Sequence, residues 1–346
     1  MKGIESYSKE KNGRSSIEIE NELKIQKGLK KLNEYLSSLA KKSNEKRPNL
    51  VEEKGDDCGR VKIAKVEHKL KVLEAQLGFG KKETNKLLDY PLECEKIVTY
   101  LFAKYLGDDY IIVRSSLYDD YFNGTDTMVV RKEDNKMVCT LNEVCGNQEQ
   151  SGPQGKENLA LERNLKGYYL NPDTGEKTEQ KGEEHFGTRC VYGVKSKNFK
   201  TPGETEEIEH CEIDDVLVLS VPLNMKEIDE VLIGLADDKS ELGGRESEIY
   251  DQCISKLIYQ AEELQDRVIT EIMTKAEEKT KKPETISWKV QMLERIKSGN
   301  TEEIKDKRLE WIEKWEKTAG KKWVAMFLQV GELIKILNQM KFKKEN

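Results

Sequence analysis

The stretch Asp108–Val144, DDYIIVRSSLYDDYFNGTDTMVVRKEDNKMVCTLNEV, combines a strand-like pattern with acidic residues at positions where apolar side chains would be expected. Tyr110–Ser115 and Thr125–Arg131 are rich in β-branched residues, and Met137–Val144 alternates with the two-residue period of a strand. Asp119–Gly124, between the first two segments, has the Asp, Asn and Gly that favour a tight turn. We therefore expect three successive strands, which form the centre of the fold.

Helical patterns lie on both sides of these strands. Pro91–Leu106 begins with a proline that favours a first helical turn, and a short helix is expected at Glu157–Leu165. Arg189–Phe199 favours a further strand or hairpin, and the continuous apolar run Asp215–Val221 is typical of a buried strand. Apolar residues at helical spacing predict helices in the remaining segments, which are Ile17–Leu39, Val61–Leu77, Lys226–Ala236, Glu246–Lys279, Glu284–Lys297, Thr301–Lys317 and Lys321–Met340.

These elements predict an α+β fold, in which a small mixed sheet with flanking helices is joined to N-terminal helices and a C-terminal helical block. Residues 1–60 are expected to hold an N-terminal helix and a flexible linker, and residues 61–223 the α/β core. The interval 146–187, rich in Gly, Gln, Glu, Lys and Asn, is predicted to be a mobile insertion in that core. Residues 224–346 make up the expected helical region.

The composition points to a soluble, cytoplasmic protein. Charged residues make up 36% of the chain and the mean hydropathy is −0.76, so much of it is expected to be solvated helix or loop. A net charge of −6 argues against a surface covered in basic residues, although it is compatible with a local basic groove. The seven cysteines are scattered without paired short spacings, which is typical of reduced thiols. The sequence contains no run of 18 apolar residues, so no membrane-spanning segment is predicted.

Two acids interrupt the predicted strands. Asp126 falls near the start of the second strand, where aspartate is disfavoured unless a metal, a backbone donor or a Lys or Arg side chain satisfies it. By the two-residue period, Glu143 shares a face with Met137, Cys139 and Leu141, so it places a carboxylate on an apolar face. The alternative for Glu143 is a residue at a strand end that reaches solvent.

A third acid, Glu93, lies in the first turn of the predicted helix. It precedes Ile97 by four residues and Leu101 by eight, which places it at the edge of the buried stripe, facing the expected sheet. Alternatively, Glu93 and Glu95 only complement the helix dipole. In the same way, Asp119 and its neighbours are explained as residues of a tight turn.

The order of helix, three strands, helix and buried strand, with acids on the first helix and on the second and third strands, resembles the PD-(D/E)XK nuclease superfamily. The resemblance spans about Leu92 to Leu223, and its most specific segments are YDDYFNGTD, YGVKSKNF and DDVLVLSVP. The chain is also similar to hypothetical proteins of small-genome bacteria that carry a DDY-x-N-G-x-D segment. The fold implied is of the restriction-endonuclease-like type.

The resemblance implies a nuclease that hydrolyses phosphodiester bonds of nucleic acid with Mg²⁺. Asp126 and Glu143 would then be the metal-binding carboxylates, with Glu143 as the acid of the E-x-K element and Glu93, or less favourably Glu95, as the helix glutamate. The E-x-K lysine position holds Cys145, so the usual lysine is missing unless another one, such as Lys166, reaches in from the following helix. If the register instead places Asn142 at the acid position, that carboxylate is missing too.

Other interpretations remain open at this stage. A catalytically inactive nuclease-fold scaffold, or a protein-interaction module with helical arms, also explains the pattern. The segment Lys321–Met340 would then contact a partner protein, a second copy or the core, in preference to lipid, and Glu246–Lys279 would be a solvated strut or a coiled-coil arm. A rival zinc site would use His185, Cys190, His210 and Cys211, although their spacing is unlike that of known zinc motifs.

Overall fold

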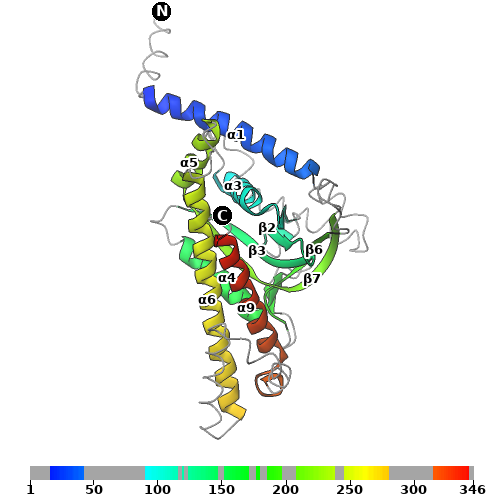
Figure 1. The fold of residues 1–346 in the computed structure, drawn as a ribbon. Helices are drawn as coiled ribbons and strands as arrows, with labels where there is room; N and C mark the ends of the chain where they lie inside the picture. Colours follow the sequence, from blue (N-terminus) through cyan, green and yellow to red (C-terminus); the bar gives the residue numbers. More distant parts are fainter. Residues whose placement is uncertain are drawn as a thin grey trace, which may run out of the picture.

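The computed structural model describes residues 16–42, 90–115, 119–120, 124–146, 152–170, 177–179, 185–196, 208–237, 245–279 and 315–342. It has a small mixed sheet surrounded by helices, which agrees with the predicted α+β class (Figure 1). The helices expected at Val61–Leu77 and Glu284–Lys297, and nearly all of Thr301–Lys317, lie outside the described residues. None of the described helices is long and apolar enough to cross a lipid bilayer.

The central sheet has four strands in the order β1-β2-β3-β8. The predicted strands correspond to β1 (Tyr110–Arg114), β2 (Thr127–Arg131), β3 (Lys136–Cys145) and β8 (Val218–Leu223). Neighbouring pairs among β1, β2 and β3 are antiparallel, whereas β8 runs parallel to β3. A parallel neighbour requires a long connection, and here α4 (Gly152–Lys166) lies within that connection.

Both faces of the sheet are covered. Val129, Leu141 and Leu219 belong to the main core beneath α3 (Tyr90–Leu106), whereas Met128 and Val130 pack in a second cluster with residues of the hairpin formed by β6 and β7. This hairpin consists of Thr188–Ser196 and Ile208–Val216, and a shorter one joins β4 (Tyr168–Leu170) to β5 (Lys177–Glu179). The sheet is therefore an interior layer, which explains the continuous apolar run in β8.

A register shift changes the side-chain alternation in β3. Val129 pairs with Cys139 and Val130 with Met137, so Val138 is the extra residue of a bulge in β3. Met137 consequently lies in the second cluster, and the prediction that it shares a face with Cys139 and Leu141 is wrong. The alternation resumes after the bulge.

The helices share one hydrophobic core with the sheet. Leu32 of α1 (Ser16–Lys42), Val231 of α5 (Met225–Ala236) and Val330 of α9 (Lys321–Phe342) are buried in the same cluster as Phe102 of α3. The helix α1 crosses α5 closely, because a Cβ on Gly28 would lie 2.0 Å from the carbonyl oxygen of Leu232. Glycine is needed at this crossing.

The long helix α6 (Arg245–Lys279) is a core element along much of its length. It runs beside α9 (Figure 1), and its buried apolar side chains extend from Ile249 to Ile272. The expectation of a solvated strut is therefore wrong for this part of the helix. For α9, core packing is confirmed, since Leu333, Leu337 and Met340 are buried.

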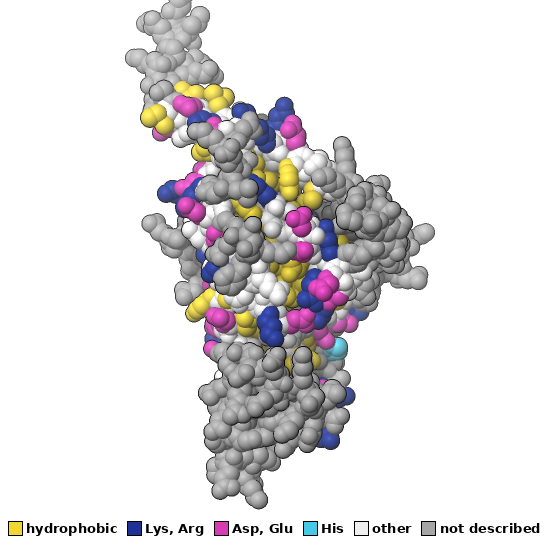
Figure 2. Space-filling model, viewed as in Figure 1, with side chains coloured by type: hydrophobic (Ala, Val, Ile, Leu, Met, Phe, Trp, Pro, Cys, Tyr) yellow, Lys and Arg dark blue, Asp and Glu magenta, His cyan; other side chains and the backbone are white. Residues whose placement is uncertain are grey.

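The start of α1 differs from the rest of that helix in its exposure. Ile17, Ile19 and Leu23 are 68%, 46% and 61% exposed, and Figure 2 shows apolar side chains at this end of the molecule. Ile25 and Leu32, further along the helix, are buried. The first turns of α1 thus present an apolar surface.

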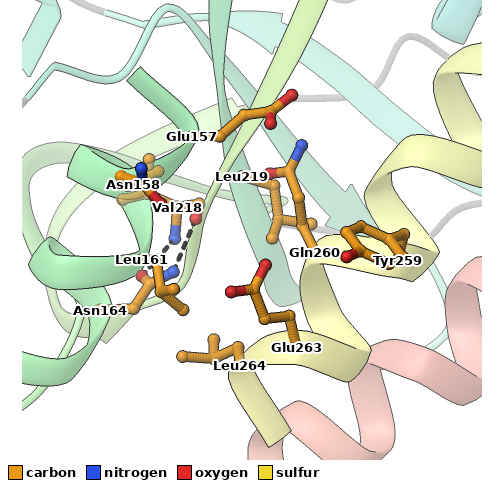
Figure 3. Close-up of a pocket in the computed structure, with 11 residues that line it drawn as sticks. Glu157, Asn158, Leu161, Asn164, Val218, Leu219, Tyr259, Gln260, Glu263 and Leu264 are labelled. Carbon is orange, nitrogen blue, oxygen red and sulfur yellow. Dashed lines mark hydrogen bonds between the residues drawn. The ribbon is translucent and has the colours of Figure 1, made fainter. Parts of the chain in front are cut away.

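Among the described residues, side chains and not a further strand close the outer edge of β8. The amide of Asn164 in α4 donates to the Val218 carbonyl oxygen at 2.7 Å and accepts from the Val218 N–H at 2.8 Å (Figure 3). Gln260 of α6 makes the same two contacts with Ser220, at 2.8 and 2.9 Å. Pro222 has no N–H, and its carbonyl oxygen accepts from Lys256 at 3.3 Å. This arrangement prevents an exposed strand edge.

Candidate functional site

Several chain segments converge at one edge of the sheet. The end of β1, the start of β2 and the end of β3 lie at the same edge because β2 is antiparallel to both neighbours. The first half of α3 covers this edge, since Glu95 forms an ion pair with Arg114 and the Thr99 hydroxyl lies 3.3 Å from that of Thr127. The acids predicted from the sequence are thereby brought into one region.

Asp126 lies immediately before β2. Its backbone N–H donates to the Leu141 carbonyl oxygen at 2.9 Å, and its carbonyl oxygen accepts from the Ser115 N–H at 2.9 Å. Its side-chain Oδ2 accepts from the backbone N–H of Glu143 at 2.7 Å. The sequence suggested a metal, a backbone donor or a Lys or Arg side chain as the partner of Asp126. The structure shows the backbone donor.

Glu143 is a buried acid, only 7% exposed. Neither carboxylate oxygen has a hydrogen-bond partner at acceptable geometry, although Asp126 and the Thr127 hydroxyl are close by. Burial raises the pKa of Glu143 well above its usual range, and the neighbouring Asp126 carboxylate raises it further. The alternative of a strand-end residue reaching solvent is therefore wrong.

Glu93 and Glu95 each have a cationic partner. Glu93 is 6% exposed and its Oε1 lies 3.0 Å from Lys96 Nζ, while its Oε2 is buried without a hydrogen-bond partner. Glu95 pairs with Arg114. Within the described ranges, no three or more His, Cys, Asp and Glu side chains group together in a way that suits a metal ion. The close acid pair thus consists of Asp126 and Glu143.

A cation close to Asp126 was not anticipated from the sequence. Lys166 is 49% exposed and faces Glu162 of its own helix at 3.8 Å, so it does not fill the position left by Cys145. Arg163, one turn earlier in α4, donates from Nη1 to the Gly124 carbonyl oxygen at 3.1 Å. Burial lowers the pKa of Arg163, while Asp126 acts to raise it.

The conformation of the turn before Asp126 depends on Gly124. Its φ is +58°, and a Cβ there would lie 2.4 Å from Arg163 Nη1. The turn interpretation of Asp119 and Asp120 is confirmed for their backbone, because their carbonyl oxygens accept from Thr125 and Gly124 at 3.2 and 3.0 Å. Glycine here allows the arginine to approach the turn.

A buried thiol lies close to the acid pair. Cys94 of α3 is fully buried, and its thiol pKa is raised well above the usual value by burial and then by Glu143. Cys145, at the end of β3, is partly buried. Chemically, two adjacent carboxylates in such surroundings favour either a shared proton or a bound cation.

Of the four rival zinc ligands, the structure describes the side chains of His185 and Cys190. His185 Nδ1 lies 3.2 Å from Asp215 Oδ1, and Cys190 is fully buried in β6. The side chains of His210 and Cys211 lie outside the described residues, although their backbones pair with Val194 and Gly193 in the β6–β7 hairpin. The observed partner of His185 is thus an aspartate.

We compared the chain with protein-family models, with curated proteins and with solved structures, and none of the three comparisons found a match.

Proposed function

We propose that this protein is a divalent-metal-dependent nuclease whose metal ligands are Asp126 and Glu143. The observation that carries the proposal is the Glu143 carboxylate, which is buried beside Asp126 with neither oxygen bonded to a donor. A buried carboxylate without a partner is costly, and a cation bound between the two acids would remove that cost.

The residues present fit Mg²⁺ or Mn²⁺. These are hard cations that prefer oxygen ligands, and Mg²⁺ is commonly held by one or two carboxylates together with waters and substrate phosphates. A pair of carboxylates is therefore a sufficient protein contribution. Oxygen donors also distinguish this pair from the thiols of Cys94 and Cys145, which would favour softer metals.

Each neighbouring residue has a role in this proposal. The Glu143 N–H fixes the Asp126 carboxylate relative to β3, so the two acids move as one unit. Arg163 holds the turn before Asp126 and places a positive charge on that side of the site. A bound divalent cation supplies the means to orient an attacking water and to neutralise charge on a phosphate. We assign Glu93 a supporting position near the site.

The order of elements also supports the proposal. The structure has α3, then β1, β2 and β3, then α4 and, after the hairpins β4–β5 and β6–β7, the buried strand β8. This is the order of helix, three strands, helix and buried strand on which the resemblance to PD-(D/E)XK nucleases rests. We therefore extend the fold proposal to the restriction-endonuclease-like type. In that arrangement Arg163 would provide the positive charge that Cys145 cannot.

The test is a cleavage assay with Mg²⁺ or Mn²⁺ on single- and double-stranded DNA and RNA. We expect Asp126→Asn and Glu143→Gln to abolish cleavage, and Arg163→Met to reduce it about 10–100-fold, as loss of a supporting residue does. Glu133→Gln, an exposed acid on the β2–β3 turn, is the matched control. Equal cleavage by Asp126→Asn and the control, or no cleavage by the unmodified protein, would remove the proposal.

The second candidate is a non-catalytic interaction module. It is favoured by the exposed apolar residues Ile17, Ile19 and Leu23 on α1, which offer a surface for a partner protein. Calorimetric titration with Mn²⁺ separates the two candidates. The nuclease proposal expects saturable binding that Asp126→Asn eliminates, whereas the module expects none at this pair.

A further inference from the structure

A pocket lies between α4 and α6, on the outer side of β8 and away from the acid pair. Its volume is about 210 Å³. At about 30 Å³ for each water-sized group, it has room for roughly seven non-hydrogen atoms. It is therefore suited to a small ligand and not to a nucleotide.

The two amide side chains on the β8 side of the pocket are already hydrogen-bonded to the strand. Asn164 and Gln260 each use one N–H and one oxygen lone pair to bond the backbone of β8. Each amide oxygen has a second lone pair that can accept from a ligand. Leu161 and Leu264 also line the pocket, from α4 and α6 respectively. The pocket thus combines apolar sides with fixed acceptors.

The charge within the pocket is negative. Glu157 extends toward it from α4, and the Glu263 carboxylate points into the gap from α6 (Figure 3). Among the described residues that line the pocket there is no Lys or Arg. Arg267 donates to Glu263 Oε1 at 3.3 Å, but both side chains are about half exposed, so this pair offsets little of the charge. A cationic ligand is favoured and an anionic one disfavoured.

We propose that this pocket binds a small organic cation that has a primary ammonium group on a short aliphatic chain. The aliphatic part would contact Leu161 and Leu264, and the ammonium would donate to Glu263 and to the amide oxygen of Gln260. An ammonium carries three donors, which matches a carboxylate placed beside amide oxygens. This proposal is independent of the acid pair at the opposite side of β8.

The test is isothermal titration of the full chain with 1,5-diaminopentane, which has seven non-hydrogen atoms. We expect saturable binding that Glu263→Gln weakens by about tenfold, the usual effect of losing one charge-assisted contact. Glu157→Gln is expected to weaken it less, because its carboxylate lies at the margin of the pocket. The neutral isostere 1,5-pentanediol should not bind measurably.

Glu262→Gln is the matched control, since Glu262 is an exposed acid next to Glu263 on α6 and does not line the pocket. It should leave the affinity unchanged. The proposal is overturned if Glu262→Gln and Glu263→Gln have the same effect, if the diol binds as tightly as the diamine, or if no saturation is seen up to about 10 mM, above any useful affinity. Because Glu263 is half exposed, these variants are not expected to unfold the protein.

Discussion

Removal of the Asn164 side chain tests how the sheet edge is stabilised. Asn164 is only 1% exposed, and its amide makes two hydrogen bonds of 2.7 and 2.8 Å to the backbone of Val218. Asn164→Ala leaves the N–H and the C=O of Val218 without partners in a buried position. The same substitution also removes two hydrogen bonds that join α4 to the strand that it covers.

The magnitude follows from these two groups. A buried donor or acceptor left unsatisfied costs about 1–3 kcal/mol, so the loss of both is expected to lower the free energy of unfolding by about 2–6 kcal/mol. Water that enters from the adjoining pocket would bond to Val218 and bring the loss toward the lower figure. We therefore expect a value near the lower half of this range.

The assay is urea unfolding followed by circular dichroism. Asn158→Ala is the matched control, because Asn158 is an exposed residue of the same helix and its replacement should change stability by less than about 0.5 kcal/mol. If Asn164→Ala unfolds at the same urea concentration as Asn158→Ala, the amide does not stabilise the strand edge. Gln260, which bonds Ser220 in the same way, would then not be expected to stabilise the outer edge of β8 either.

Two further predictions concern the acid pair and a helix crossing. The pKa of Glu143 is raised in the folded state, so metal-free protein should lose stability as pH rises from the unfolded pKa through the folded pKa. In thermal melts, the stability of Glu143→Gln relative to the unmodified protein should therefore increase between pH 5 and pH 8. A stability difference that stays constant over this pH range would contradict the prediction. Gly28→Ala should destabilise by about 2 kcal/mol or more, because its Cβ would lie 2.0 Å from the Leu232 oxygen. A Cβ on Gly331 would lie 3.5 Å from Gln265 Nε2, so Gly331→Ala should be neutral or stabilising by up to about 1 kcal/mol. Similar denaturation midpoints for the two variants would refute the close crossing.

Local patterns predicted the main elements of the fold because each element depends on its own sequence period. The β-branched residues of β1 and β2 and the stripe of α3 are sufficient to place those elements. The bulge in β3 was not predictable, because it depends on how Val129 and Val130 pair with the next strand. One extra residue in β3 moved Met137 to the opposite face.

The position of Glu143 was predictable, whereas that of Arg163 was not. Strand alternation placed the Glu143 carboxylate on an apolar face, and its burial agrees with this. The link between Arg163 and the Asp126 turn spans 39 residues and depends on how α4 lies on the sheet. The only local signal was an arginine three residues before Lys166, on a helix whose predicted span was too short.

The balance of charge around Asp126 and Glu143 connects metal binding with nucleic-acid binding in the nuclease proposal. Glu93 and Glu95 are offset by Lys96 and Arg114, whereas Arg163 lies close enough to Asp126 for that carboxylate to act on its pKa. When both acids are ionised, this pair repels a phosphodiester. In the nuclease proposal, a cation bound to the pair would remove this repulsion before a phosphodiester binds there. If Mn²⁺ fails to bind, nucleic acid should fail to bind there as well, and the surface of α1 would become the better guide to function.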